Sequence, residues 1–102
     1  ELLSNVDMIW DMVEAGKEID FATRAMVRRT QVRAAWRAVM AVDQIFARSG
    51  GNALRMDKPL QQFWRDCHSG LNHAIHVPST VFHASALSSL GIDPPQQLRS
   101  MI

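Results

Sequence analysis

The stretch FWRDCHSGLNHAIHVP, residues 63–78, has the pattern of an amphipathic helix that is broken near its end. We expect the helix to begin at Pro59, because a proline at the first helical position lacks only an N–H group that would have no partner there. At about 100° per residue, its apolar and polar side chains fall on two separate faces. The apolar face holds Leu60, Phe63, Trp64, Cys67, Leu71, Ala74 and Ile75, and the polar face holds Arg65, His68, Ser69, Asn72, His73 and His76. Pro78 predicts a kink or a restart near Val77, after which the helix continues to Gly91.

Two further helices are predicted before this stretch. Apolar side chains recur at helical spacing through residues 3–15 and stop at Gly16. Asp20 can cap a second, unusually long helix, whose apolar stripe begins at Phe21 and continues until the glycines at Gly50.

No segment shows the alternation typical of a strand. The sequence therefore predicts an all-α fold, an up-and-down bundle of three long helices in one domain, residues 1–102. After Gly91 we expect an extended tail, because Asp93 and Pro94 each precede a proline. Helices with apolar faces this wide would expose tryptophan and methionine, so we expect another helix, domain or subunit to cover them.

Composition and charge limit the possible partners. A chain of 102 residues with 47% hydrophobic content and a net charge of +1 predicts one small globular domain and argues against a nucleic-acid partner. No apolar run reaches the length of a membrane span, so no membrane partner is expected. The single cysteine, Cys67, excludes an internal disulfide and favours a reducing compartment, for which the cytoplasm is the default. The chain has no initiator methionine, and we expect it to be part of a longer protein.

Five arginines lie along the second helix at positions that favour a solvated or ion-paired face over a phosphate-binding patch, because the total charge is close to zero. They are Arg24, Arg28, Arg29, Arg33 and Arg37.

The sequence disfavours two kinds of site for the histidines. A metal site is disfavoured, because no glutamate stands at helical ligand spacing from any histidine. A Ser-His-Asp triad is disfavoured too, because no strained Gly-x-Ser-x-Gly turn occurs. For His68, His76 and His83 we favour surface or interface positions. For His73, close to the predicted kink, a proton-transfer role and a structural role stay equally open on the residues alone.

The segment IFARSGGNALRMDKPLQQFWRDCHSGLNHAI, followed by LSSLGIDPP, resembles a known family. It is similar to the C-terminal helical domain of the acyl-CoA dehydrogenase fold. More narrowly, it resembles the two-component flavin-dependent monooxygenases that hydroxylate aromatic compounds, such as 4-hydroxyphenylacetate and secosteroid hydroxylases. The combination of Pro-Leu, Trp-Arg-Asp and a histidine eight residues after the arginine carries this resemblance.

The resemblance implies specific roles. His73 matches a catalytic histidine that faces the flavin and the substrate, and Ala74 matches its flavin-contacting neighbour. Gly50, Gly51 and Asn52 match a loop that approaches the flavin through its backbone, where the lack of a Cβ on the two glycines allows close contact. A further pair, Arg65 and Asp66, matches residues expected to join helices within the bundle.

The resemblance also implies reduced FMN or FAD from a separate flavin reductase, dioxygen, an aromatic substrate and a homotetramer. The family's N-terminal helical domain and central β-barrel are missing from these residues, so the fragment alone should be inactive. Two alternatives stay open. A true acyl-CoA dehydrogenase would need a carboxylate base near the flavin, and the region of His73 offers none; a non-catalytic helical oligomerisation domain would need no role for His73.

Overall fold

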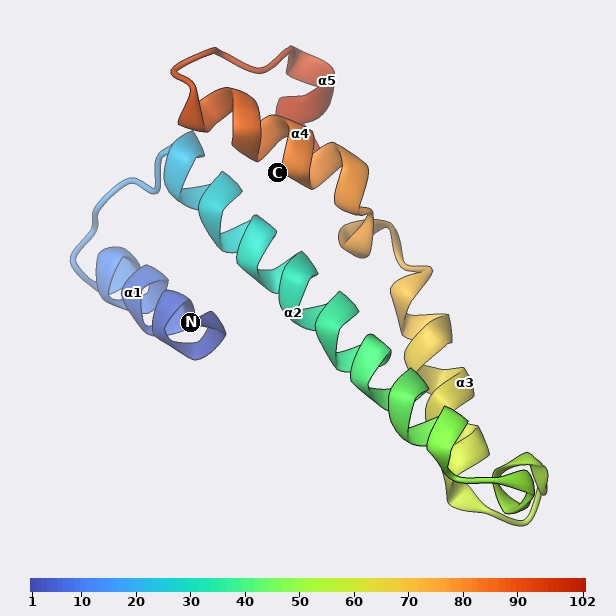
Figure 1. Ribbon diagram of the computed structural model, residues 1–102. Helices are drawn as coiled ribbons and strands as arrows, with labels where there is room; N and C mark the ends of the chain where they lie inside the picture. Colours follow the sequence, from blue (N-terminus) through green and yellow to red (C-terminus); the bar gives the residue numbers. More distant parts are fainter.

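The computed structural model covers residues 1–102 and contains helices and no strands (Figure 1). In chain order the elements are α1 (Leu2–Glu14), α2 (Phe21–Arg48), the short 3₁₀ helix η1 (Gly51–Leu54), α3 (Pro59–Leu71), the 3₁₀ helix η2 (Ala74–His76), α4 (Pro78–Ser89) and α5 (Gln96–Arg99). The predicted all-α fold is confirmed. The molecule measures 51 × 29 × 18 Å, and its length follows that of α2, about 42 Å at 1.5 Å per residue.

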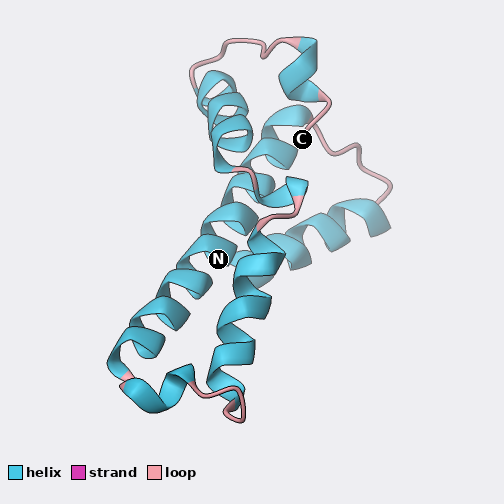
Figure 2. Ribbon diagram, turned by 90° about the vertical axis from the view of Figure 1, so that its right-hand side faces the viewer, coloured by secondary structure: helices cyan, strands magenta, loops and turns pink.

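Helix α2 organises the other elements. Helix α4 packs against its first half and α3 against its second half, while α1 packs less extensively against it (Figures 1 and 2). The small core lies mostly between α2 and α4. Its buried apolar residues are Ala25, Val32 and Val39 on α2, Val81 and Ala84 on α4, and Ala53 on η1.

Both ends of α2 follow from its sequence, as predicted. At the start, the Asp20 carboxylate accepts a hydrogen bond of 2.8 Å from the backbone N–H of Thr23, which caps the helix. Hydrogen bonding from the Thr23 side chain and from this backbone N–H lowers the pKa of the Asp20 carboxyl. At the other end, Gly50 has φ +67°, a left-handed conformation that glycine adopts without a steric penalty.

Of the predicted kink or restart near Val77, the restart is confirmed, because α4 begins at Pro78 with Val77 as its N-cap and the predicted third helix is two helices. Helix α3 ends at Leu71, and α4 begins only at Pro78, with η2 between them. A proline at position 78 cannot donate to the Ala74 carbonyl, and its ring would clash there in a continuous helix. The break already begins after Leu71, so it is longer than the sequence indicated.

We expect an extended tail after Gly91, but the tail is extended only in part, because its last residues form α5. The guanidinium of Arg99 lies 4.7 Å from the ring centroid of Phe21, and its Nη1 lies 3.5 Å from Asp93 Oδ1. The contact with Phe21 ties the tail to the start of α2. The Asp-Pro-Pro segment itself is not helical, and Pro95 has φ −55° and ψ 151°, so the expected extended backbone holds up to the first residue of α5.

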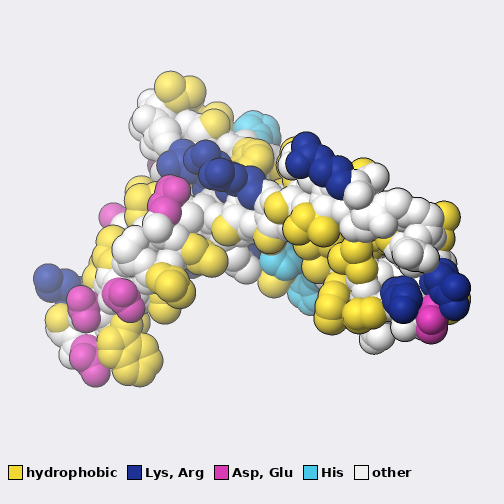
Figure 3. All heavy atoms as spheres, turned by 60° about the horizontal axis from the view of Figure 1, so that its bottom comes forward, with side chains coloured by type: hydrophobic (Ala, Val, Ile, Leu, Met, Phe, Trp, Pro, Cys, Tyr) yellow, Lys and Arg dark blue, Asp and Glu magenta, His cyan; other side chains and the backbone are white.

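Large apolar side chains remain exposed, as predicted for this chain on its own. On α1, Leu3 is 77% and Trp10 64% exposed, and on α3 Phe63 is 60% exposed. Figure 3 shows such hydrophobic side chains over much of the visible surface. None of the helices combines the length and apolar character that crossing a membrane requires.

Candidate functional site

His73 lies in the break between α3 and α4 rather than on a helix. It is the N-cap residue of η2, and its exposed ring is held by the backbone: the Ile75 N–H donates to His73 Nδ1 over 3.2 Å. Because an N–H can only donate, Nδ1 carries no proton in this arrangement, and the neutral ring carries its proton on Nε2. His73 therefore presents an N–H donor away from its own backbone.

Side chains of α2 hold η2 in place. Trp36 Nε1 donates to the His76 carbonyl over 2.9 Å, and Arg28 Nη2 donates to the Ile75 carbonyl, also over 2.9 Å. Arg28 is itself oriented, because its Nη1 donates to Gln31 Oε1. The break leaves these carbonyls outside regular helix bonding, and α2 supplies the missing donors.

A second polar cluster joins α2 to α3 one to two turns before His73. Asp43 Oδ1 accepts hydrogen bonds of 2.7 Å from both Trp64 Nε1 and His68 Nε2. The Trp64 ring also stacks on Phe46, with 5.3 Å between centroids. The hydrogen bond from His68 lowers the pKa of the Asp43 carboxyl, and the bond from Trp64 acts in the same direction.

The sequence had pointed to His68 as a surface or interface residue and had not pointed to Asp43. The side chain of His68 is 40% exposed, but it has a charged partner on another helix. Asp43 could have been noticed, because it is the only acidic residue of α2 and lies four residues after the buried Val39. A cavity of about 170 Å³ adjoins this pair and is lined by Trp36, Val39, Met40, Asp43, His68, Leu71 and Asn72.

The predicted glycine-rich loop lies elsewhere. Gly50, Gly51 and Asn52 are exposed at the end of α2, before the first residue of α3. A Cβ added at Gly50 or Gly51 would meet no atom within 4 Å, so nothing in this chain crowds the backbone there. His73 and Ala74 follow the other end of α3, about 20 Å away for 13 residues at 1.5 Å each (Figure 1). The structure does not bring these two groups of predicted site residues together.

Two other predicted features can also be placed. The five α2 arginines form no ion pair with any carboxylate, so their face is solvated rather than ion-paired, apart from the hydrogen bonds of Arg28. Arg65 and Asp66 are both exposed and form no ion pair either. The expectation that they join helices is therefore wrong within this chain.

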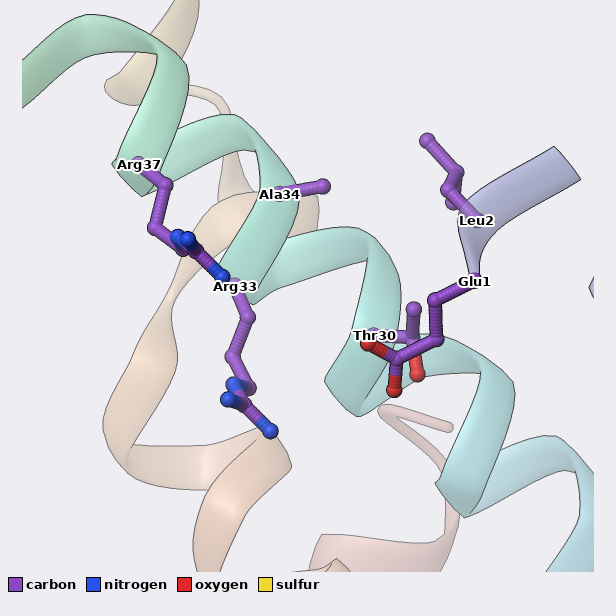
Figure 4. A pocket seen from close by; sticks show the side chains of 6 residues that line it. All are labelled: Glu1, Leu2, Thr30, Arg33, Ala34 and Arg37. Carbon is purple, nitrogen blue, oxygen red and sulfur yellow. The ribbon is translucent and has the colours of Figure 1, made fainter. Parts of the chain in front are cut away.

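A separate cavity of about 250 Å³ lies between the start of α1 and the middle of α2 (Figure 4). Its lining residues are Glu1, Leu2, Thr30, Arg33, Ala34 and Arg37. In Figure 4 the Glu1 carboxylate lies beside Thr30. None of the predicted site residues lines this cavity, and no three His, Cys, Asp or Glu side chains gather anywhere in a way that could hold a metal ion.

The architecture, with five α-helices and no strands packed around the long helix α2, places the chain among all-helical bundle domains. The chain matches the acyl-CoA dehydrogenase C-terminal domain over residues 1–78, and it belongs to that family. It is 66% identical over 101 residues to the pigment production hydroxylase of Rhodococcus erythropolis, covering 99% of this chain and 26% of that protein. It is 39% identical over 94 residues to HsaA, the oxygenase subunit of a flavin-dependent monooxygenase from Mycobacterium tuberculosis, covering 92% of this chain and 24% of that one.

Solved structures give the same assignment. The crystal structure of the HsaA monooxygenase from M. tuberculosis matches with a TM-score of 0.84 and 40% identity, covering 93% of this chain and 24% of that one. The 3-HSA hydroxylase from Rhodococcus sp. RHA1 matches with a TM-score of 0.86 and 36% identity, covering 93% and 25%. The resemblance inferred from the sequence is confirmed, and the chain spans about a quarter of the length of these relatives.

Proposed function

We propose that this chain is the C-terminal helical domain of a flavin-dependent monooxygenase that hydroxylates an aromatic or phenolic substrate. In this proposal a separate reductase supplies reduced flavin, and dioxygen supplies the inserted oxygen atom. The observation that carries the proposal is the exposed side chain of His73, whose Nδ1 accepts the Ile75 N–H and so leaves Nε2 as the donor of the neutral ring. Support also comes from the relatives, which are named as a hydroxylase and as oxygenase subunits of flavin-dependent monooxygenases.

The residues of η2 suit a flavin. A flavin ring offers nitrogen and carbonyl acceptors, and His73 offers an N–H donor beside the small side chain of Ala74. We assign His73 and Ala74 to the reactive ring and the exposed backbone of Gly50, Gly51 and Asn52 to a second flavin contact. The flavin, FMN or FAD, supplies the redox chemistry when bound, while the protein supplies orientation and electrostatics.

His73 acts in this proposal as the catalytic donor. Its Nε2–H can stabilise negative charge that develops on an oxygen or nitrogen atom at the reacting centre. As a base, the neutral ring would have to take the new proton at Nδ1, which would displace the Ile75 N–H that occupies it. The geometry of η2 therefore favours donation from Nε2 over proton abstraction from a phenol.

The remaining parts of the proposal concern partners. We propose that a reductase component delivers the flavin, either in a transient complex or by diffusion. The term oxygenase subunit implies such a separate component for HsaA. We also propose a homotetramer in the cytoplasm, in which neighbouring surfaces cover the exposed apolar side chains of α1 and α3.

The test uses the full-length protein. It is titrated without oxygen with reduced FMN and with reduced FAD, then mixed rapidly with oxygenated buffer and 4-hydroxyphenylacetate or other simple phenols while flavin absorbance and product are followed. We expect tight binding of one reduced flavin and a hydroxylated product. Tight binding of oxidised FAD together with oxidation of an acyl-CoA would instead favour the dehydrogenase reading, and failure to bind either flavin would contradict the proposal.

A further inference from the structure

We propose that Arg28 and Trp36 are positioning residues for His73, which they control through the backbone of η2. This inference rests on the proposed function of His73. Neither side chain is expected to touch the flavin or the substrate, since each reaches only the turn that carries the histidine.

The two donors hold consecutive peptide groups. Arg28 binds the carbonyl of Ile75 and Trp36 binds the carbonyl of His76, both at 2.9 Å. One hydrogen bond would leave the turn free to rotate about the contact, whereas two on adjacent carbonyls fix both the position and the orientation of the turn. Arg28 binds the carbonyl of the residue whose N–H donates to the His73 ring, so its contact lies one peptide group after the one that holds the imidazole.

The two donors come from one rigid face. Arg28, Val32 and Trp36 follow each other at four-residue spacing on α2, and Val32 between them is fully buried. Burial of Val32 anchors the helix backbone that carries both donors. Rigid elements place catalytic groups more accurately than loops do, and these two contacts hold the η2 turn in a fixed position relative to helix α2.

The position of Trp36 adds a second constraint. Its indole helps to line the cavity beside Asp43 and His68, and it also lines a hollow with Pro78 and Phe82 at the start of α4. Trp36 therefore lies where α2 faces both the end of α3 and the start of α4, while its N–H points to the turn between them. A phenylalanine would keep most of this apolar contact and lose only the hydrogen bond.

The test combines hydrogen exchange with kinetics in the full-length protein. The variants are Trp36→Phe, Arg28→Met and the double variant, with Arg28→Lys as the conservative rescue. Matched controls are Trp10→Phe and Arg37→Met, because Trp10 is exposed on α1 and Arg37 forms no hydrogen bond or ion pair.

The first measurement is amide hydrogen exchange in the flavin-free protein. The amides of Ile75, His76 and Val77 bond within η2 to His73 Nδ1, His73 O and Ala74 O. Losing one tether should speed their exchange about fivefold, which corresponds to about 1 kcal/mol for one hydrogen bond, and the double variant should exceed either single variant. Arg28→Lys should recover part of the protection, and the controls should not differ from the wild type.

The second measurement is kcat and KM for the phenol that gives the highest product yield. We expect kcat to fall about tenfold or more in the double variant with KM nearly unchanged, because small misplacements of a catalytic group cost up to about a hundredfold. In a His73→Asn background the same double substitution should have little further effect on kcat, since there is no longer a catalytic ring to position.

The outcomes separate the two proposals. If His73→Asn abolishes hydroxylation but the double variant keeps normal exchange or a normal kcat, the positioning role is refuted and the function of His73 stands. If His73→Asn hydroxylates as well as the wild type, the catalytic role of His73 fails, and the positioning role fails with it.

Discussion

The two nitrogens of the His73 ring have separable roles, and substitution can distinguish them. Nδ1 accepts the Ile75 N–H at 3.2 Å and so caps η2, whereas Nε2 carries the proposed chemistry. Asparagine places an amide oxygen near the position of Nδ1 and has nothing at Nε2. Glutamine places an amide N–H near Nε2 and lacks the cap, and alanine lacks both.

The expected magnitudes follow from these losses. Removing an N-cap acceptor costs about 0.5–2 kcal/mol, and we expect about 0.5 kcal/mol for His73→Ala and His73→Gln, because the ring is exposed and η2 has only three residues. His73→Asn should keep nearly all of this stability. In contrast, His73→Ala and His73→Asn should both reduce hydroxylation about 10²- to 10³-fold, the usual effect of removing one hydrogen-bond donor to developing charge, while His73→Gln should retain part of the activity.

The assays are hydrogen exchange of the η2 amides for the cap and single-turnover product formation with saturating reduced flavin for the chemistry. Two results would refute the reasoning independently. Equal protection of the Ile75 amide in His73→Ala and the wild type would show that Nδ1 does not cap the turn. Full product yield in His73→Asn would show that Nε2 takes no part in the reaction.

Three further predictions concern the scaffold. The hydrogen bond from His68 holds the Asp43 pKa below its unfolded value of about 3.9. The stability that this hydrogen bond contributes is therefore present above that pH and is lost as the pH falls through the folded-state pKa. Urea unfolding between pH 3 and pH 6 should show a steeper acid loss of stability in the wild type than in Asp43→Asn. Val32→Ala removes two buried methyl groups at about 0.8 kcal/mol each and leaves a cavity, for a loss of about 2 kcal/mol, whereas Val13→Ala on exposed α1 should change the unfolding free energy by less than about 0.5 kcal/mol. Gly50→Ala forces an L-residue to φ +67° and should cost about 1–2 kcal/mol, whereas Gly51→Ala, which meets no atom and needs no positive φ, should be nearly neutral; equal effects in denaturant unfolding would contradict this difference.

Local patterns predicted the helices well where one strong feature fixed each boundary. Asp20 caps the start of α2, Gly50 turns the chain just after the end of α2, and Pro59 is the first residue of α3. Each boundary depends on residues that are close together in the sequence. The apolar periodicity also gave the correct fold class, because each face must be buried or covered.

The same approach placed the helix restart correctly but did not predict the length of the break, because the contacts that hold η2 are distant in sequence. Pro78 signals a break, but η2 is held by Arg28 and Trp36, which lie 47 and 40 residues before the carbonyls they bind. The helical spacing of apolar residues within one segment does not indicate which distant side chains bind its backbone. Asp43 was missed for the same reason, since its partners Trp64 and His68 lie on another helix.

The separation of the two predicted flavin contacts limits how the site can work. A flavin ring at His73 cannot also touch the Gly50 turn, because α3, about 20 Å long at 1.5 Å per residue, lies between them. A substitution in the glycine turn should therefore alter flavin affinity without changing the fixed ring of His73, and a change at His73 should alter chemistry without changing that turn. Similarity to a family suggested both contacts at once, but the geometry makes each an independent hypothesis. His73 is the better supported of the two, because its ring orientation, its turn and the two α2 donors form one connected arrangement.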